Sequence, residues 1–156
     1  MKQTRRNVLQ ASGGATVIAL AASVGIFKSG NLYAADWNKA AFDTKSLQET
    51  VKAMGGTAAT ESKEINITSP DIAENGAVVP VSVASKLAKT ESISILVEKN
   101  PNALSAAFEI PGGTEPFVST RVKMGQTSNV YALVKADGKY FFATKEIKVT
   151  LGGCGG

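Results

Sequence analysis

The sequence predicts a mainly β protein: an immunoglobulin-like antiparallel β-sandwich with a short N-terminal helix and a flexible C-terminal arm. Hydrophobic residues alternate with polar ones in seven short runs between residues 64 and 151, the pattern of strands that have one buried face. Turn-forming residues separate these runs at the spacing expected of a sandwich. A single stretch with helical periodicity precedes the runs, and a glycine-rich pentapeptide follows them.

The predicted helix lies within residues 37–54, where three apolar residues recur at the spacing of one helical face: Leu47, Val51 and Met54. Residues 46–49, Ser-Leu-Gln-Glu, have the spacing of a capping box. Gly55-Gly56 ends the run where a left-handed cap is needed. We expect the apolar stripe to lie against the β domain and the small, polar residues 57–62 to form a linker.

The seven predicted strands follow in chain order at residues 64–68, 77–84, 93–97, 104–110, 118–124, 128–135 and 140–151. The last two are joined by Asp137-Gly138, a strong signal for a tight hairpin. In the last strand, alternate residues from Ile147 to Leu151 would face the core, while Lys148 and Thr150 face solvent. This strand therefore anchors the segment that follows it.

The C-terminal arm, Gly152-Gly153-Cys154-Gly155-Gly156, contains the only cysteine of the chain. Glycine adopts both signs of φ, so two glycines on each side leave the thiol on a thin, flexible terminus. A lone cysteine in an exported protein indicates intermolecular pairing or a reactive thiol. The terminal carboxylate disfavours the thiolate, so the thiol is a modest nucleophile that another protein would have to activate. We predict that Cys154 carries the function.

The first 35 residues have the features of an export signal. A basic start with adjacent Arg5 and Arg6 precedes a weakly hydrophobic stretch and small residues near the expected cleavage point. Paired arginines in this position resemble the twin-arginine signature, which exports folded proteins to the bacterial periplasm. The predicted organisation is a signal peptide at residues 1–35, the helix and sandwich at 36–151, and the arm at 152–156.

Charge and composition exclude several classes of function. Four of the 17 basic residues precede Asp36, and the 13 that remain balance the 13 acidic residues, so nucleic-acid and anionic-membrane partners have no electrostatic basis. The chain has no histidine, which removes the usual general base and the commonest metal ligand. One cysteine cannot build a zinc site. We therefore predict no catalytic residue, no metal site and no cofactor of its own.

Three segments carry a resemblance to a known family: residues 122–130 (VKMGQTSNV), residues 143–151 (ATKEIKVTL) and the GGCGG terminus. Together they resemble the sulfur-carrier Y subunit of the periplasmic Sox thiosulfate-oxidising complex, the SoxY family. The export signal and the N-terminal helix agree with this resemblance. It therefore extends over essentially the whole chain.

The resemblance implies an immunoglobulin-like sandwich that forms a heterodimer with a Z-type subunit, itself a small β-sandwich protein. Cys154 would carry the sulfur substrate as a covalent adduct. A haem enzyme would couple thiosulfate to the cysteine, a manganese hydrolase would release sulfate, and in some organisms a molybdenum-haem dehydrogenase would oxidise the remaining sulfane sulfur. The cofactors would belong to these partners.

Two other interpretations remain open at this level. The chain could be an exported structural subunit that uses Cys154 only for an intermolecular disulfide. It could also resemble carriers that are adenylated at a terminal Gly-Gly and converted to a thiocarboxylate, although that chemistry needs cytoplasmic ATP and the export signal opposes it.

Overall fold

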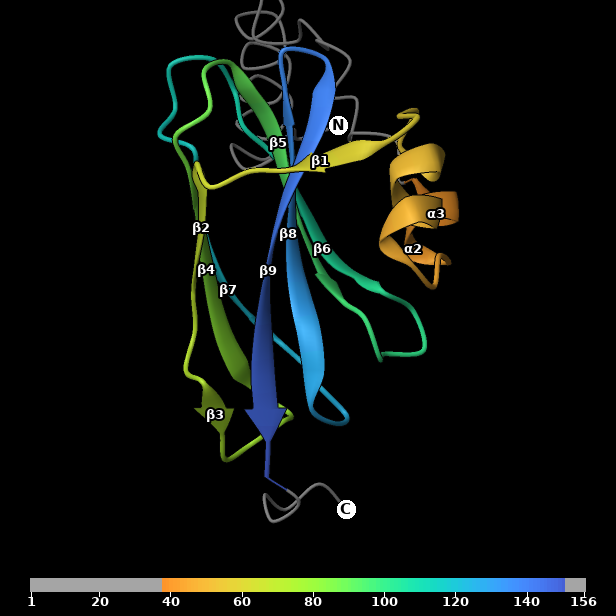
Figure 1. The fold of residues 1–156 in the computed structure, drawn as a ribbon, viewed down its shortest axis with the longest axis vertical. Coiled ribbons are helices and arrows are strands. Elements are labelled where there is room, and N and C mark those ends of the chain that lie inside the picture. Colours follow the sequence, from red (N-terminus) through yellow and green to blue (C-terminus); the bar gives the residue numbers. More distant parts are fainter. Residues whose placement is uncertain (1–37, 151–156) are drawn as a thin grey trace, which may run out of the picture. The chain divides into compact units, whose positions relative to one another are not determined.

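The computed structural model describes residues 38–150, which form a β-sandwich preceded by two helices (Figure 1). The elements are α2 (Lys39–Phe42), α3 (Leu47–Ala53), β1 (Ala59–Glu61), β2 (Ile65–Thr68), β3 (Ile72–Ala73), β4 (Val79–Ser85), β5 (Thr90–Val97), β6 (Leu104–Glu109), β7 (Phe117–Val122), β8 (Ser128–Ala136) and β9 (Lys139–Val149). The larger sheet has the strand order β1-β9-β8-β5-β6, with β3 also paired to β9, and the smaller has the order β2-β4-β7. The predicted mainly β, immunoglobulin-like fold is confirmed.

The core lies between the two sheets, where alternate residues of each strand meet. In β4 the three valines at positions 79, 81 and 83 are buried, and the outward Pro80 is exposed. Opposite them, β5 contributes Ile93, Ile95 and Val97, and Ile147 of β9 completes the same cluster. Burial of these branched side chains is the main stabilising contribution to the sandwich.

A second apolar cluster lies on the other face of the larger sheet, under the helices. Val51 of α3 packs there with Leu96, Leu133 and Tyr140. Because the helices cover this face, both sides of β5 are buried from Ser92 to Val97. This confirms that the apolar stripe of the helix lies on the β domain.

The helical stretch differs from the prediction because it is divided in two. The break falls at Asp43–Lys45, where the Thr44 hydroxyl lies 2.6 Å from the Thr50 hydroxyl and the Thr44 carbonyl accepts a hydrogen bond from the amide N–H of Ala103 (2.8 Å). The second contact ties the break to the β5–β6 loop, a tertiary interaction that no local pattern reveals. The predicted cap is present, since the Ser46 hydroxyl accepts from the Glu49 N–H.

Two short strands replace segments that were predicted as loop. Residues 57–62 were expected to form a linker, but β1 lies within them and pairs in parallel with residues 140–142 of β9. Strand β3 also pairs in parallel with β9, at Lys148 and Val149. The sandwich is therefore antiparallel except along this edge of β9.

The predicted hairpin between the last two strands is confirmed. Asp137 and Gly138 have φ values of 48° and 72°, the left-handed pair that matches the twist of a two-residue hairpin. Strands β8 and β9 then pair in an unbroken antiparallel register from Ala136 and Lys139 to Ser128 and Ile147. Strand β9 is consequently held along its whole length, up to the point where the C-terminal arm follows.

Candidate functional site

The base of the C-terminal arm is the last segment of backbone that the structure describes, Lys148 to Thr150, at the end of β9. Three hydrogen bonds hold it. The N–H of Lys148 donates to the carbonyl oxygen of Asp71 (2.9 Å), and the N–H of Thr150 donates to that of Ala73 (3.1 Å). The third bond runs from the N–H of Val149 to the Thr127 hydroxyl oxygen (3.0 Å). Consecutive amides thus bond to two different segments, which fixes the direction in which the chain leaves the sandwich.

Gly76 allows these segments to come together. Its carbonyl accepts from the N–H of Met124 at 2.7 Å. A Cβ at this position would lie 2.4 Å from the carbonyl oxygen of Met124 and 2.9 Å from a methyl group of Val149. A glycine is therefore required here for close approach of backbone, the second use of this residue besides positive φ.

Charged residues near the arm base pair with one another. Lys145 lies 3.0 Å from the Asp71 carboxylate, and its ammonium group also donates to the carbonyl oxygen of Ser69 at 2.6 Å. Glu74 and Lys148 are exposed. Charges of both signs thus surround the arm base in small numbers, and they do not form a strong field of one sign.

The predicted site residues themselves lie outside the described residues. This applies to Cys154, to the arm glycines Gly152, Gly153, Gly155 and Gly156, to Arg5 and Arg6, and to the boundaries of the signal peptide. Within residues 38–150 no group of histidine, cysteine, aspartate and glutamate side chains could hold a metal ion. In the same range no helix is long and apolar enough to cross a membrane.

The structure adds residues that sequence reasoning did not assign to the site: Thr127, Gly76 and the segment Asp71–Ala73. In the sequence, Asn75-Gly76 is an ordinary turn signal, and nothing local indicates that Gly76 lies against Met124 and Val149. Thr127 falls within the stretch that carries the family resemblance, but its hydroxyl gives no sign in the sequence that it accepts a bond from β9. Contacts between segments far apart in the chain cannot be deduced from local periodicity.

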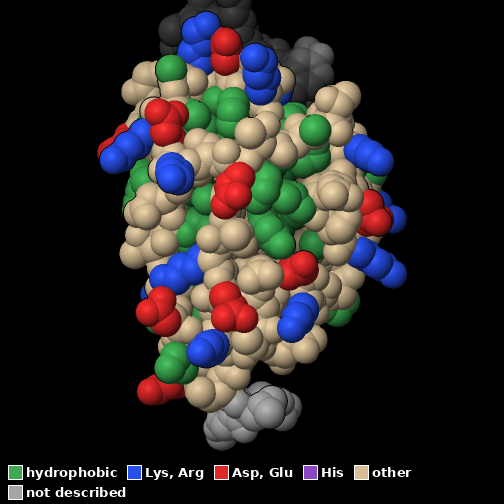
Figure 2. Space-filling view, in the orientation of Figure 1, with side chains coloured by type: hydrophobic (Ala, Val, Ile, Leu, Met, Phe, Trp, Pro, Cys, Tyr) green, Lys and Arg blue, Asp and Glu red, His purple; other side chains and the backbone are tan. Residues whose placement is uncertain are grey.

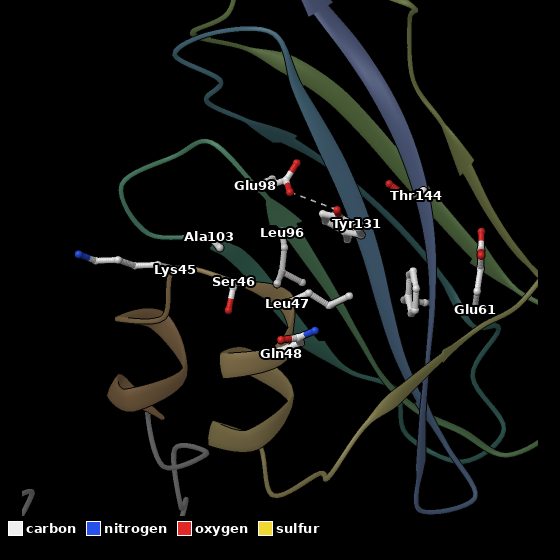
Figure 3. A pocket seen from close by; sticks show the side chains of 11 residues that line it. Lys45, Ser46, Leu47, Gln48, Glu61, Leu96, Glu98, Ala103, Tyr131 and Thr144 are labelled. Atoms are coloured by element: carbon white, nitrogen blue, oxygen red, sulfur yellow. Dashed lines mark hydrogen bonds between the residues drawn. The ribbon is translucent and has the colours of Figure 1, made fainter.

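A cavity of about 530 Å³ lies between the start of α3 and the larger sheet (Figure 3). Tyr131 and Phe142 meet edge to face on its floor, with ring centres 6.1 Å apart. The Tyr131 hydroxyl donates to Glu98 at 3.4 Å, and the Asn129 side-chain amide donates to the other oxygen of Glu98 at 2.9 Å. Burial raises the pKa of Tyr131 above its usual value, and the Glu98 carboxylate raises it further. The tyrosine therefore stays protonated at neutral pH, which makes it a poor general base.

The face of the molecule that Figure 2 shows has no large patch of a single charge. Figure 2 shows hydrophobic side chains near the centre of the visible face, with basic and acidic side chains scattered around them. A nucleic-acid site would need basic side chains concentrated along one path. This face has no such path.

Two comparisons with known proteins find the same family. The model of a family described as "Sulfur oxidation protein SoxY" matches residues 50–154. Among solved structures, the sulfur carrier protein SoxY from Chlorobium limicola f thiosulfatophilum is similar at 39% sequence identity and a TM-score of 0.62. That alignment covers 67% of this chain and 96% of the other. A search of the curated proteins gives no significant match.

A more distant likeness is found to the superoxide reductase (neelaredoxin) from Ignicoccus hospitalis. It has 22% identity and a TM-score of 0.48, and the alignment covers 55% of this chain and 80% of that one. A similarity of this size carries no argument about function.

Proposed function

This chain belongs to the SoxY family of sulfur oxidation proteins, and on that premise we propose that it is a sulfur carrier that binds thiosulfate-derived sulfur covalently at Cys154. The observation that supports the proposal most directly is the extent of the family match. It runs through residue 154 and so includes the only cysteine of the chain. The anchored arm base just before it supplies the fixed support that a presented thiol needs.

In this proposal the chemistry at Cys154 requires an electron acceptor and a hydrolytic catalyst, which other proteins supply. Forming a bond between the cysteine sulfur and the outer sulfur of thiosulfate releases the thiol proton and two electrons. In this proposal a separate redox enzyme accepts those electrons. Hydrolysis of the resulting S-sulfonate then consumes one water, releases sulfate and two protons, and leaves a deprotonated persulfide, Cys–S–S⁻. The carrier contributes position and access, and its partners contribute catalysis.

The proposed partners comprise one binding subunit and the enzymes that catalyse the successive steps. They are a Z-type subunit that forms a heterodimer with the chain, a haem enzyme for coupling, a manganese hydrolase for sulfate release and, where it exists, a molybdenum-haem sulfane dehydrogenase. The proposed location is the periplasm, reached through a twin-arginine signal at residues 1–35. The glycines of the arm allow Cys154 to enter narrow catalytic centres, because they add no side chains to the thread.

The test of the proposed function is Cys154→Ser. We expect thiosulfate-dependent oxidation by the complete system to be abolished. Mass spectrometry of wild-type protein incubated with thiosulfate and its enzymes should show a sulfur-containing adduct on residue 154. The free energy of unfolding should change by less than about 0.5 kcal/mol, as expected for a substitution in a glycine-rich terminal segment.

Two outcomes would contradict the carrier function. Retained activity in Cys154→Ser would exclude covalent attachment at this residue. A wild-type protein that forms only disulfide-linked dimers, without any sulfur adduct, would favour the structural role in which Cys154 joins two chains.

A further inference from the structure

The cavity between α3 and the larger sheet lies apart from the arm base. Of the residues that line it, Thr144 is the nearest in sequence to the arm. Thr144 precedes Thr150 by six residues, which is roughly 20 Å along a strand at about 3.3 Å per residue. Cys154 is the fourth residue after Thr150, so it reaches at most about 14 Å from there at about 3.5 Å per residue. The cavity is therefore out of reach of the thiol, and its volume of about 530 Å³ is that of a small-molecule site.

The floor of this cavity is aromatic. It is formed by Tyr131 of β8 and Phe142 of β9, which are both partly buried and whose ring centres are 6.1 Å apart. Leu47 of α3 and Leu96 of β5 add aliphatic surface to the lining. The face of an aromatic ring attracts a cation, while its bulk offers apolar contact. This floor therefore suits an alkyl chain that carries positive charge.

A glutamate stands at each end of the aromatic floor. The strand order β1-β9-β8-β5 places Glu61 of β1 beside Phe142, with which it pairs. Glu98 follows the end of β5 and accepts a hydrogen bond from the Tyr131 hydroxyl at 3.4 Å. Figure 3 shows the two glutamates on opposite sides of Tyr131. The order across the cavity is thus acid, ring, ring, acid.

Neither carboxylate has a cationic partner among residues 38–150. The ion pairs in this range involve other acidic residues: Asp43, Asp71, Glu91 and Asp137. Lys45 is the one basic residue in the lining, and Figure 3 shows that its side chain points away from the other lining residues. The Asn129 side-chain amide orients Glu98 by donating to its second oxygen at 2.9 Å. Each carboxylate oxygen has two lone pairs, so Glu98 can still accept hydrogen bonds from an ammonium group.

We propose that this cavity binds a free linear aliphatic diamine such as cadaverine. One ammonium group contacts Glu98, the other contacts Glu61, and the methylene chain lies on the two rings. A lysine or arginine side chain of another protein brings a single cation on a stem that is tethered at its other end, so it would meet only one of the two carboxylates. The inference does not rest on the carrier function, and its test does not use Cys154.

The experiment uses three probes with the same pentyl body: cadaverine, pentylamine and pentanol, which carry two, one and no positive charges at neutral pH. Each is titrated into the isotopically labelled full-length protein, and the NMR shifts of the Tyr131 and Phe142 amides report binding. We expect a Kd for cadaverine in the millimolar range, because exposed ion pairs and cation–π contacts are weak. Pentylamine should bind roughly three- to fivefold more weakly, because it lacks one ion pair. Added salt should weaken the binding of cadaverine most.

Two variants remove one carboxylate charge each and keep the side-chain shape. Glu98→Gln and Glu61→Gln should each raise the Kd of cadaverine roughly three- to fivefold, with the Kd of pentanol unchanged. Glu115→Gln is the matched control. It removes the same charge from an exposed glutamate in the loop before β7, outside the cavity lining, and should bind cadaverine as the wild type does.

Four results would overturn the inference. The first is the absence of any cadaverine-dependent shift at Tyr131 and Phe142 in the wild type. The second is equal affinity for cadaverine and pentanol, which would make the cavity a purely apolar site. The third is a loss of affinity in Glu115→Gln as large as that in Glu98→Gln, which would indicate attraction to the overall charge. The last is binding of Nα-acetyl-lysine amide as tightly as cadaverine, which would identify a protein side chain as the occupant.

Discussion

At the residue scale, two buried serines in neighbouring strands have opposite surroundings. Ser94 of β5 has a buried hydroxyl for which the described residues provide no hydrogen-bond partner. Ser128 of β8 accepts a bond from the N–H of Lys99 and donates to the carbonyl oxygen of Asn129, both at 3.0 Å. A buried hydroxyl without a partner costs free energy, whereas a bonded one contributes modestly to stability.

We therefore predict that Ser94→Ala raises the free energy of unfolding by up to about 1 kcal/mol, because it removes an unsatisfied polar group. Ser128→Ala is the matched control and should lower it by about 1 to 2 kcal/mol, because it leaves the Lys99 N–H without its partner. Urea denaturation followed by circular dichroism measures both. A clear loss of stability in Ser94→Ala would show that its hydroxyl has a partner after all, such as a buried water.

Charged side chains near the β8–β9 turn form two ion pairs. Lys89 binds Asp137 and Lys135 binds Glu91, each at 2.8 Å. These contacts lower the pKa of Asp137 and of Glu91. Lys89 and Asp137 are exposed and Lys135 and Glu91 are partly exposed, so screening by water and salt keeps their effect on stability small.

At the element scale, the end of β9 depends on the parallel strand β3 and on the turn that contains Gly76. The arm base has hydrogen bonds to β3 and to Thr127, and the Gly76 turn contacts Val149. Displacement of this turn would loosen the residues from which the C-terminal arm leaves. A strand of only two residues, β3, thus holds the backbone from which the C-terminal arm leaves.

We predict that Gly76→Ala destabilises the protein by about 1 to 3 kcal/mol, because the new Cβ overlaps the backbone carbonyl of Met124. Gly125→Ala is the matched control. A Cβ at Gly125 meets no atom within 4 Å, so its stability should stay within about 0.5 kcal/mol of the wild type. Hydrogen exchange at Val149 and Thr150 should increase only in Gly76→Ala. Equal stability of the two variants would mean that the close approach at Gly76 relaxes at no cost.

At the scale of the whole molecule, the absence of histidine shapes the response to pH. The chain has none, and the shifted groups move away from neutrality. The pKa of Asp137 and of Glu91 is lowered, while that of Lys89, Lys135 and Tyr140 is raised. The stability from the lowered carboxyl groups is present above their unfolded pKa values of about 4 and is lost as the pH falls further. The stability contributed by the lysines and the tyrosine with raised pKa values is present below about pH 10 and is lost above it.

We therefore predict a melting temperature that is constant within about 2 °C between about pH 5.5 and 8.5, with a decline below about pH 4. Differential scanning calorimetry of the protein with Cys154 alkylated measures this directly, since alkylation removes the titration of the thiol. A transition centred near pH 6 or 7 would contradict the prediction, because it would require a carboxyl or amine group whose pKa had moved several units toward neutrality.

Much of the fold was predictable because it follows from local chemistry. The alternating residues of β4 and of most of β8 pack as their period indicates, and Asp137-Gly138 forms the expected hairpin. Gly55, with a φ of 86°, ends the helix as a left-handed cap. Each of these features depends on the side-chain pattern or on the backbone preference of one or two residues.

The parts that were not predictable depend on contacts between distant segments. Strands β1 and β3 are held by the backbone of β9 and have three and two residues, too few to show a period. The break between α2 and α3 is tied to the β5–β6 loop by the bond to Ala103. The predicted site, Cys154 and its flanking glycines, lies outside the described residues. It therefore stays a prediction.

The sequence by itself determined the immunoglobulin-like class, the final hairpin, the family and the single cysteine at the terminus. Only the tertiary structure decided how the arm base is held and which residues contact it: Thr127, Gly76 and the segment Asp71–Ala73. The physical reason is that alternation and turn propensity act over a few neighbouring residues. The pairing of β1 and β3 with β9 depends instead on the backbone N–H and C=O groups of β9 that have no partner once the sandwich has formed. A segment from anywhere in the chain can form hydrogen bonds with those groups.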